Sequence, residues 1–284
     1  MPLRAIAQTN IGAATLTTVS DGNLVLPAGF IFDPMPQDEL QKVRAAYGLE
    51  GDQLTPECNL ALYQDGENTV LFDAGSGPDF AASAGKISDS LDALGVAPDE
   101  ITHVVFTHAH PDHIWGVLDD FDDPFYSEAT YYMGRDEWDY WWNPATVDEI
   151  GAARQAFAVG AKRRMEAIED AVALFDDGDE VLPGISAVAS FGHTPGHMSF
   201  EVRQGNDAAL VVGDAIGNHH VAFERPEWPS GSDQDAETAI ISRKRLLDRL
   251  TAEKLKLVGF HLPNGGMGRV EKSDVGYRFI GDRA

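Results

Sequence analysis

The chain has 284 residues, of which 43% are hydrophobic, and it carries a formal net charge of −25. So acidic a chain opposes binding to nucleic acid or to anionic membranes. The sequence contains no run of 18 consecutive apolar residues, so no transmembrane helix is expected. Its single cysteine, Cys58, excludes an internal disulfide.

Length and composition favour one enzyme domain. A chain of this length can bury a large core, and it shows no repeat or linker, so a single domain over residues 1–284 is predicted. Residues 1–7 hold no sustained apolar core, so we expect no secretory signal and a cytoplasmic location. The acidic runs 119–123 and 176–180 lack the spacing of an EF-hand loop and are interpreted as solvated surface.

Residue alternation and turn signals predict the elements of the first half of the chain. Strands are expected at residues 14–19, 58–63, 69–72 and 101–107, with a strand-to-helix passage at 131–135. A helix is expected at 88–95, with Gly95 as its C-cap. The tract 30–56 is rich in Pro, Asp and Gln; we expect a short helix at 37–47 and a role as an arm or a lid.

The second half of the chain begins with a long helix on the outside, expected at 152–170. A second sheet is expected from strands at 181–191, 198–202 and 208–212. An amphipathic helix is expected at 236–250, a last buried strand at 256–260 and a turn at 273–276.

A dense group of potential metal ligands follows the apolar run 104–106. Its members are His108, His110, Asp112 and His113. Alternation along an extended segment places the first two histidines on one side, and Pro111 then turns the chain so that the other two side chains approach from another direction. Imidazole nitrogens with a carboxylate are typical of a catalytic zinc-type site.

Three further apolar runs each end at or just before a potential ligand. They lead to His193, to Asp214 and to His261. A metal site built on strand ends is held rigidly, as catalysis requires.

Together these motifs resemble the metallo-β-lactamase superfamily over most of the chain. The resemblance implies a four-layer αββα sandwich of the α/β class. It implies a first metal held by His108, His110 and His193. It implies a second metal held by Asp112, His113 and His261, with Asp214 bridging the two.

Two more residues take their interpretation from this resemblance. Asp73 matches the family's early aspartate, which supports the ligands from behind. His197 matches no ligand position and is expected to support a ligand or to order its loop.

Within the superfamily, residues 259–268 and 276–279 look like the methyl parathion hydrolase-like group, as does the start of the chain at Asp21-Gly22 and Leu26-Pro27. That group and the neighbouring N-acyl-homoserine lactonases hydrolyse lactones, aryl esters and phosphotriesters. This chain departs from the group at residues 263–266, which replace an aromatic and proline-rich stretch, and at Trp115, where a small residue is common. Both departures are expected to reshape the pocket.

The predicted function is a dinuclear metal-dependent hydrolase acting on an ester, lactone or phosphotriester through a metal-bridging hydroxide. Two divalent ions make such a hydroxide available because they lower the pKa of bound water toward about 7. Zinc is the expected metal, and manganese, iron or cobalt would suit the same ligands. Asp112 is predicted to orient the nucleophile or to shuttle a proton.

Other readings of the same motifs stay open at this point. A glyoxalase II-like thioesterase shares the ligand order, but only 23 residues follow His261, too few for its helical extension. A ribonuclease Z-type enzyme would need a basic surface. A persulfide dioxygenase-like oxidoreductase binds one iron, which the complete second ligand set disfavours. A binding protein that kept the fold and lost catalysis is the last alternative.

The aromatic segment 138–142 is the predicted source of the pocket wall. Its candidates are Trp138, Trp141 and Trp142, although Trp138 and Trp142, four apart on a helix, could instead pack on the core. Together with the acidic charge, this segment predicts a small neutral or weakly charged substrate and neither nucleic acid nor membrane as a partner. The tract 30–56 would also suit a homodimer arm.

Overall fold

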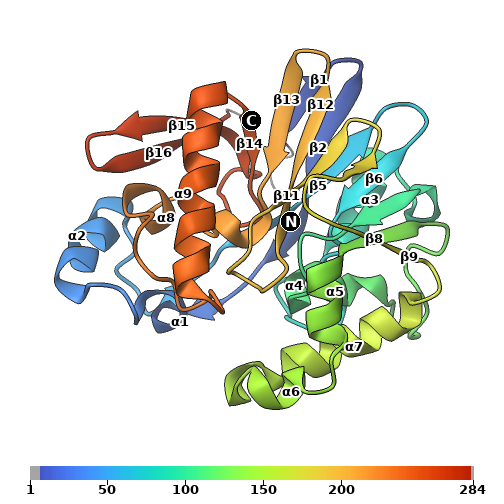
Figure 1. Cartoon of the computed structure of the whole chain (residues 1–284), viewed down its shortest axis with the longest axis horizontal. Helices are drawn as coiled ribbons and strands as arrows, with labels where there is room; N and C mark the ends of the chain where they lie inside the picture. Colours follow the sequence, from blue (N-terminus) through green and yellow to red (C-terminus); the bar gives the residue numbers. More distant parts are fainter. Residues whose placement is uncertain (1–6, 283–284) are drawn as a thin grey trace.

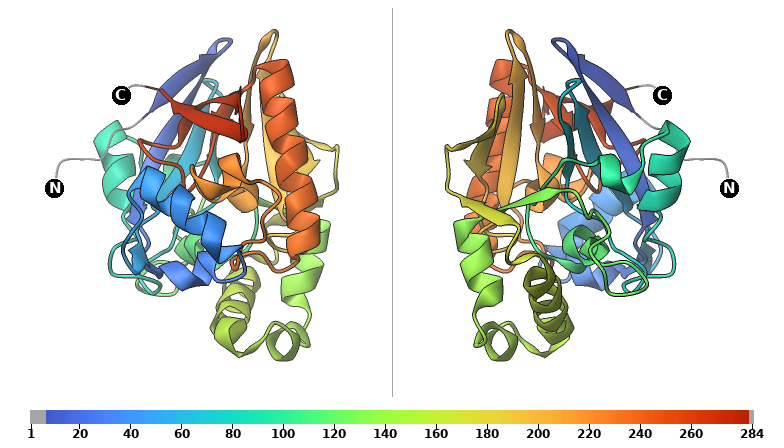
Figure 2. Two further views of the ribbon diagram at one scale, coloured as in Figure 1. Left: turned by 90° about the vertical axis from the view of Figure 1, so that its left-hand side faces the viewer. Right: turned by 90° about the vertical axis from the view of Figure 1, so that its right-hand side faces the viewer.

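The computed structural model describes residues 7–282 (Figure 1). Two seven-stranded sheets face each other and helices cover their outer faces, which confirms the predicted αββα sandwich (Figures 1 and 2). Among the described residues, no helix is long and apolar enough to cross a membrane. Residues 1–6, which bear on the predicted absence of a secretory signal, lie outside the described residues.

The first sheet has the order β1-β2-β5-β6-β7-β8-β9. Its strands are β1 (Gln8–Ile11), β2 (Ala14–Asn23), β5 (Glu57–Gln64), β6 (Thr69–Phe72), β7 (His103–Val105), β8 (Thr130–Gly134) and β9 (Val172–Phe175). From β6 to β9 all pairings are parallel. The carboxyl ends of these strands therefore meet at one edge, where the loop after β7 carries the histidine motif.

The second sheet has the order β10-β11-β12-β13-β14-β15-β16. Its strands are β10 (Glu180–Leu182), β11 (Ile185–Ala189), β12 (Met198–Gln204), β13 (Asp207–Val211), β14 (Lys256–Val258), β15 (Met267–Ser273) and β16 (Gly276–Gly281). Only β13 and β14 pair in parallel, and this pairing brings the chain after each of them to the same edge. A separate pair, β3 (Leu26–Pro27) and β4 (Gln53–Leu54), lies outside both sheets.

The helices lie outside the two sheets or in the loops at their edges. The α-helices are α1 (Ala28–Phe32), α2 (Gln37–Tyr47), α3 (Ile87–Leu94), α4 (Pro111–Ile114), α5 (Arg135–Trp142), α6 (Thr146–Glu149), α7 (Gln155–Ile168), α8 (Val221–Glu224) and α9 (Ala236–Glu253). The 3-10 turns are η1 (Pro98–Glu100), η2 (Trp115–Val117), η3 (Ala152–Arg154) and η4 (Gly213–Ile216).

Strand periodicity explains how one strand serves two layers. In β5, Leu60 and Leu62 pack toward the outer helices, whereas Ala61 and Tyr63 pack in the core between the sheets. All four are buried, so the strand reads as a continuous apolar run. Across the central core, the rings of Phe72 and Phe200 lie 5.4 Å apart and join the two sheets.

Several predicted elements differ from the observed ones. The strand expected at 181–191 is a hairpin, β10 and β11, because Pro183-Gly184 forms a turn in which Gly184 has φ +77°. The strand expected at 101–107 ends at Val105, since the N–H of Thr107 donates to the Asp73 side chain instead of to a strand. The helix expected at 152–170 begins as the 3-10 turn η3 and continues as α7. Strands β1, β3, β4, β9, β15 and β16 were not predicted, although the turn between the last two was.

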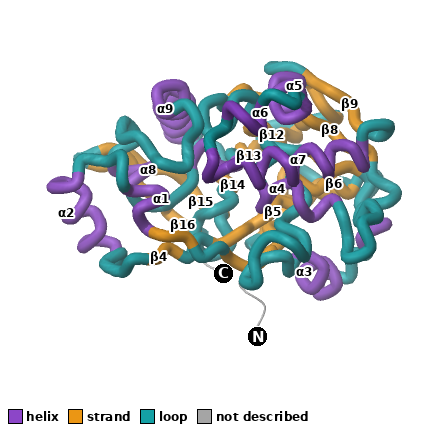
Figure 3. Tube along the Cα trace, turned by 90° about the horizontal axis from the view of Figure 1, so that it is seen from below, coloured by secondary structure: helices purple, strands orange, loops and turns teal. Residues whose placement is uncertain are grey.

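The tract 30–56 folds against the same chain. We call residues 24–56 the cap segment; it contains β3, α1, α2 and β4. Phe32, Leu40 and Val43 of this segment share a small core with Val221 of α8 and with Trp228. Seen from below, α1 and α2 lie beside α8, and α7 lies across the sheet edge from them (Figure 3).

Candidate metal centre

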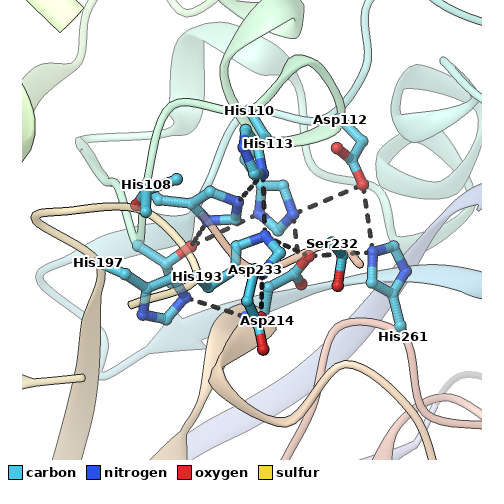
Figure 4. A network of polar contacts seen from close by, with 12 residues as sticks. His108, His110, Asp112, His113, His193, His197, Asp214, Ser232, Asp233 and His261 are labelled. Carbon is cyan, nitrogen blue, oxygen red and sulfur yellow. Dashed lines mark hydrogen bonds and ion pairs between the residues drawn. The ribbon is translucent and has the colours of Figure 1, made fainter. Parts of the chain in front are cut away.

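The predicted donor residues meet at the edge where both sheets end their parallel strands. His108 and His110 lie in the loop after β7, and α4 then starts at Pro111, so Asp112 and His113 approach from a helical turn. The second sheet supplies His193 after β11, Asp214 in η4 after β13, and His261 after β14. All seven side chains converge in one buried network (Figure 4).

Three imidazoles form the first donor group. His110 Nδ1 lies 3.0 Å from His108 Nε2 and 2.9 Å from His193 Nε2. All three residues are buried, and one ligand atom from each lies within 4.8 Å of the others. This geometry can hold one cation between three nitrogens.

The second donor group combines two histidines and two carboxylates. His113 Nε2 lies 3.6 Å from Asp112 Oδ2 and 3.5 Å from Asp214 Oδ1. His261 Nε2 lies 3.3 Å from Asp112 Oδ2. The ligand atoms of these four residues also lie within 4.8 Å of one another.

Asp214 stands between the two groups. Its Oδ2 is 3.3 Å from His193 Nε2 in the first group and 3.3 Å from His261 Nε2 in the second. The Asp214 N–H donates to His197 Nε2 at 3.0 Å, and His197 Nδ1 pairs with Ser190 Oγ at 2.8 Å. His197 therefore orders the loop that carries Asp214.

The other ring nitrogen of most donor histidines meets an oxygen. His113 Nδ1 binds Asp73 Oδ2 at 2.8 Å, His193 Nδ1 binds Asp233 Oδ1 at 3.2 Å, and His261 Nδ1 binds the carbonyl of Glu57 at 2.8 Å. A carboxylate or carbonyl only accepts, so each Nδ1 donates and Nε2 of the neutral ring keeps its lone pair for the interior of the site. Asp73 adopts φ +67° and is held by Thr107 N–H at 2.7 Å.

The donor set fits divalent cations on two further grounds. Asp112 Oδ2, His113 Nε2 and Asp214 Oδ1 are buried without a hydrogen-bond partner among the described residues, although they face one another. Burial alone would lower the pKa of His113, but the carboxylates of Asp112, Asp73 and Asp214 outweigh it and raise this pKa to about 10. The site thus favours positive charge where a cation would bind.

One buried carboxylate that the sequence analysis missed joins the two donor loops. Glu137 of α5 accepts hydrogen bonds from Ala109 N–H at 2.9 Å and Gly196 N–H at 3.0 Å, one from each loop. It also accepts from Thr194 Oγ1 at 2.7 Å and Trp141 Nε1 at 2.6 Å. Burial raises the pKa of Glu137, and these four donors oppose that rise. A lone glutamate on a helix gives no sequence signal for this role.

A cavity of about 360 Å³ opens over the donor residues. His110, Asp112, His193, Asp214 and His261 line its floor. The cap segment lines it with apolar side chains, namely Leu24, Leu26, Phe30, Ile31, Leu49 and Leu54. Phe80 and Phe157 complete the apolar lining from the body of the protein. Such a cavity suits a small, partly apolar ligand.

The pocket wall predicted at Trp138, Trp141 and Trp142 is corrected by the structure, because none of the three lines this cavity. Trp138 and Trp142 stack on each other with ring centroids 4.9 Å apart, and Lys162 of α7 covers Trp142. Trp141 is 1% exposed and supports His110 from behind, with ring centroids 5.8 Å apart. Their packing partners come from α7 and the donor loops, which a local aromatic pattern does not reveal.

Fold and site together define a metal-dependent hydrolase: an αββα sandwich whose His and Asp donor groups face a cavity at one sheet edge. The family model described as "Metallo-beta-lactamase superfamily" matches residues 56–261 of the chain, and this range contains every donor residue. The chain belongs to this superfamily.

Curated relatives agree with this assignment. An uncharacterised protein of Mycobacterium tuberculosis is 29% identical over 72% of this chain and 86% of its own length. The N-acyl homoserine lactonase AttM of Agrobacterium fabrum is 31% identical over 127 residues, 44% of each protein. A hydroxyacylglutathione hydrolase of Methylococcus capsulatus is 28% identical over 55% of this chain and 50% of its own length.

Solved structures share the fold over nearly the whole chain. The hydrolase AbOPH superposes with a TM-score of 0.92 at 24% identity, covering 100% of this chain and 99% of its own. AidC, a dizinc quorum-quenching lactonase in complex with a product, superposes with a TM-score of 0.91 at 24% identity and the same coverage.

Proposed function

We propose that this protein is a dinuclear metal hydrolase that opens lactones or cleaves aryl esters or phosphotriesters, and that residues 1–284 act as one domain. The main observation in support is the position of Asp214, whose Oδ2 lies 3.3 Å from a histidine nitrogen of each donor group. A single carboxylate that reaches both groups would bridge two ions. The likeness to lactonases supports the substrate class.

The proposed ligands of the first ion are His108, His110 and His193, and those of the second are Asp112, His113 and His261, with Asp214 shared. Zinc is the proposed metal. Two ions bound there would polarise the scissile carbonyl or phosphoryl group and make a bound water acidic enough to supply the nucleophile near neutral pH.

The side chains of this chain have separate tasks in that reaction. Asp73, Asp233 and the Glu57 carbonyl fix the orientation of three imidazoles, so the floor is already arranged before substrate binds. Asp112 lines the cavity directly beside the second donor group, with its Oδ2 3.3 Å from His261 Nε2. It is therefore placed to orient the attacking water and to take its proton.

The cap segment acts as a lid in this proposal. It lines the cavity mainly with apolar side chains and packs on α8 of the same chain, so it completes the pocket without a second subunit. An apolar cover excludes water from the reacting bond and favours neutral or weakly charged, partly apolar substrates.

The test is a metal count joined to a hydrolysis panel. Protein purified without chelator should carry two divalent ions per chain. After reconstitution, one lactone or aryl ester should reach a kcat/KM above about 10⁴ M⁻¹s⁻¹, the low end for true enzyme substrates. Phosphotriesters and β-lactams complete the panel.

Two results would contradict the proposal. One iron per chain with oxygen-dependent turnover of a persulfide would identify a dioxygenase. Preference for a glutathione thioester would identify a glyoxalase II-like thioesterase.

A further inference from the structure

One arginine in the cavity wall lacks a carboxylate partner. Arg154, at the end of η3, is the only Lys or Arg among the residues that line the cavity. Its Nη2 donates to the carbonyls of Gly231 at 2.8 Å and Ser232 at 3.0 Å. Its Nε is buried without a hydrogen-bond partner, and no described residue forms an ion pair with it.

The position of Arg154 distinguishes it from the other arginines without an ion pair. Among the described residues, Arg44, Arg225, Arg245 and Arg269 form no ion pair either, but they do not line the cavity, and only Arg154 among these five has its Nε buried without a hydrogen-bond partner. Asp233, whose charge acts on Arg154 without direct contact, is already bound to Arg243 Nη2 at 2.6 Å and to His193. A partly desolvated charge without a carboxylate in direct contact costs free energy, so a guanidinium at this place in the cavity wall favours a role in binding a ligand.

The guanidinium is also held in place. Two backbone carbonyls fix Nη2, while Nη1 makes no hydrogen bond to any described residue. On its other side the Phe30 ring of α1 lies with its centroid 5.9 Å from Arg154 Cζ. Arg154 therefore stands where the cap segment meets the body of the protein, with a donor free beside the cavity.

We propose that Arg154 is a specificity-determining residue that donates a hydrogen bond to an acceptor oxygen, a carbonyl or a carboxylate, that the substrate carries in addition to its scissile group. The inference rests on the proposed lactone or ester hydrolysis and names the substrate feature that the cavity selects. The rest of the wall is mainly apolar, so a single fixed donor that lines the cavity can decide how an otherwise apolar substrate is oriented.

Matched substrates test this directly. We would compare α-hexanoylamino-γ-butyrolactone, which has a second carbonyl, with α-heptyl-γ-butyrolactone, which has none, and with α-(5-carboxypentyl)-γ-butyrolactone, which ends in a carboxylate. In Arg154→Met we expect KM for an acceptor-bearing lactone to rise at least about tenfold, as for loss of a charged hydrogen bond. For the heptyl lactone we expect a change below about threefold.

The control variant is Arg163→Met, on the outer side of α7, where Arg163 is paired with Asp79 and Asp122 outside the cavity. It should leave all three KM values unchanged. Arg154→Lys keeps the charge without the fork-shaped donor and should fall between wild type and Arg154→Met. If Arg154→Met raises KM more for the acylamino lactone, the acceptor is a carbonyl oxygen. If it raises KM more for the carboxypentyl lactone, the acceptor is a carboxylate oxygen.

Binding measurements separate this inference from the proposed function. The lactams that correspond to the acylamino and heptyl lactones resist hydrolysis, and calorimetry with metal-loaded protein gives their Kd values. If no lactone were turned over, the proposed function would fail, yet a loss of acylamino-lactam binding confined to Arg154→Met would still support Arg154. If Arg154→Met weakened binding of the acylamino lactam and the heptyl lactam equally, or affected neither, the inference would be overturned.

Discussion

The floor and the roof of the cavity are built by different physical means. The floor is formed by the donor groups: five of the seven donor residues line the cavity, and all seven are buried or nearly so. An oxygen partner orients four of the five donor histidines. The roof is the cap segment, which meets the cavity with apolar side chains and has Phe30 38% exposed. Polar contacts are directional and hydrophobic contacts are not, so the floor can set the chemistry while the roof sets the fit.

The largest expected effect comes from breaking the floor at its shared carboxylate. Asp214→Ala removes the oxygen that lies 3.3 Å from both donor groups. We expect metal content to fall below one ion per chain and activity to drop more than about 10³-fold, because the proposed reaction requires both ions. Elemental analysis and steady-state kinetics measure both, and circular dichroism checks the fold. Asp176→Ala, on the exposed surface, is the control; a variant that kept two ions and full turnover would show that Asp214 does not bridge.

The second effect is on stability and tests how the floor is held together. Glu137→Ala leaves four buried donors from two loops without an acceptor. We expect a loss of about 3–5 kcal/mol in the free energy of unfolding, with Glu137→Gln losing less because it keeps one acceptor oxygen. Denaturant titration measures the difference. Equal stability of all three proteins would show that the carboxylate is dispensable.

The third effect concerns pH and the support of the roof. His220 lies beneath the cap segment, against Phe32 and Tyr47, and its Nδ1 accepts from Val221 N–H at 2.8 Å. Burial, with a smaller effect of His219, lowers the pKa of His220 to about 3, so the unfolded chain binds its proton first as the pH falls below 6.5. Stability is then lost on acidification, with about 1–2 kcal/mol assigned to this residue between pH 7 and pH 5.

The matched change for that experiment is His220→Asn, which keeps an acceptor at the start of α8. Its free energy of unfolding should fall less steeply than that of the wild type across the same pH range. Parallel curves for the two proteins would assign the acid sensitivity to other groups.

The smallest expected effect distinguishes the apolar side chains of the roof from the tryptophans outside the cavity. Leu54→Ala removes part of the roof and should raise KM for an apolar lactone about three- to tenfold without changing metal content. Trp138→Ala, outside the cavity, should leave KM unchanged although it removes a stacked ring. If Trp138→Ala raised KM and Leu54→Ala did not, the tryptophans rather than the cap segment would form the substrate wall.

The same contrast explains what could be predicted from sequence. The floor was predictable because its ligands are rare residue types at fixed spacing, each placed by the end of an apolar strand. The two-layer burial of β5 and its neighbours also gave a clear signal, since continuous apolar runs indicate strands covered on both faces. The hairpin of β10 and β11 could have been found as well, because Pro183-Gly184 is a turn signal.

The roof and its supports could not be predicted in the same way. The cavity-lining leucines of the cap segment belong to no motif, and they come together only when α1 and β4 fold back over the donor residues. Trp138 and Trp142 were assigned to the pocket from the local aromatic segment, which does not reveal that the two rings stack on each other and that Lys162 of α7 covers Trp142. Glu137 and Arg154 resemble ordinary helix-surface charges until tertiary contacts show what surrounds them.

The order of the donor residues along the chain has a consequence for biosynthesis. The first sheet contributes residues 108 to 113, but the second donor group is complete only when His261, after β14, has been synthesised and docked. Each donor group takes ligands from both sheets, so neither group is complete until the two sheets have docked. A cation that binds there would therefore select the folded chain, and we expect it to raise the free energy of unfolding of the finished protein rather than to start its folding.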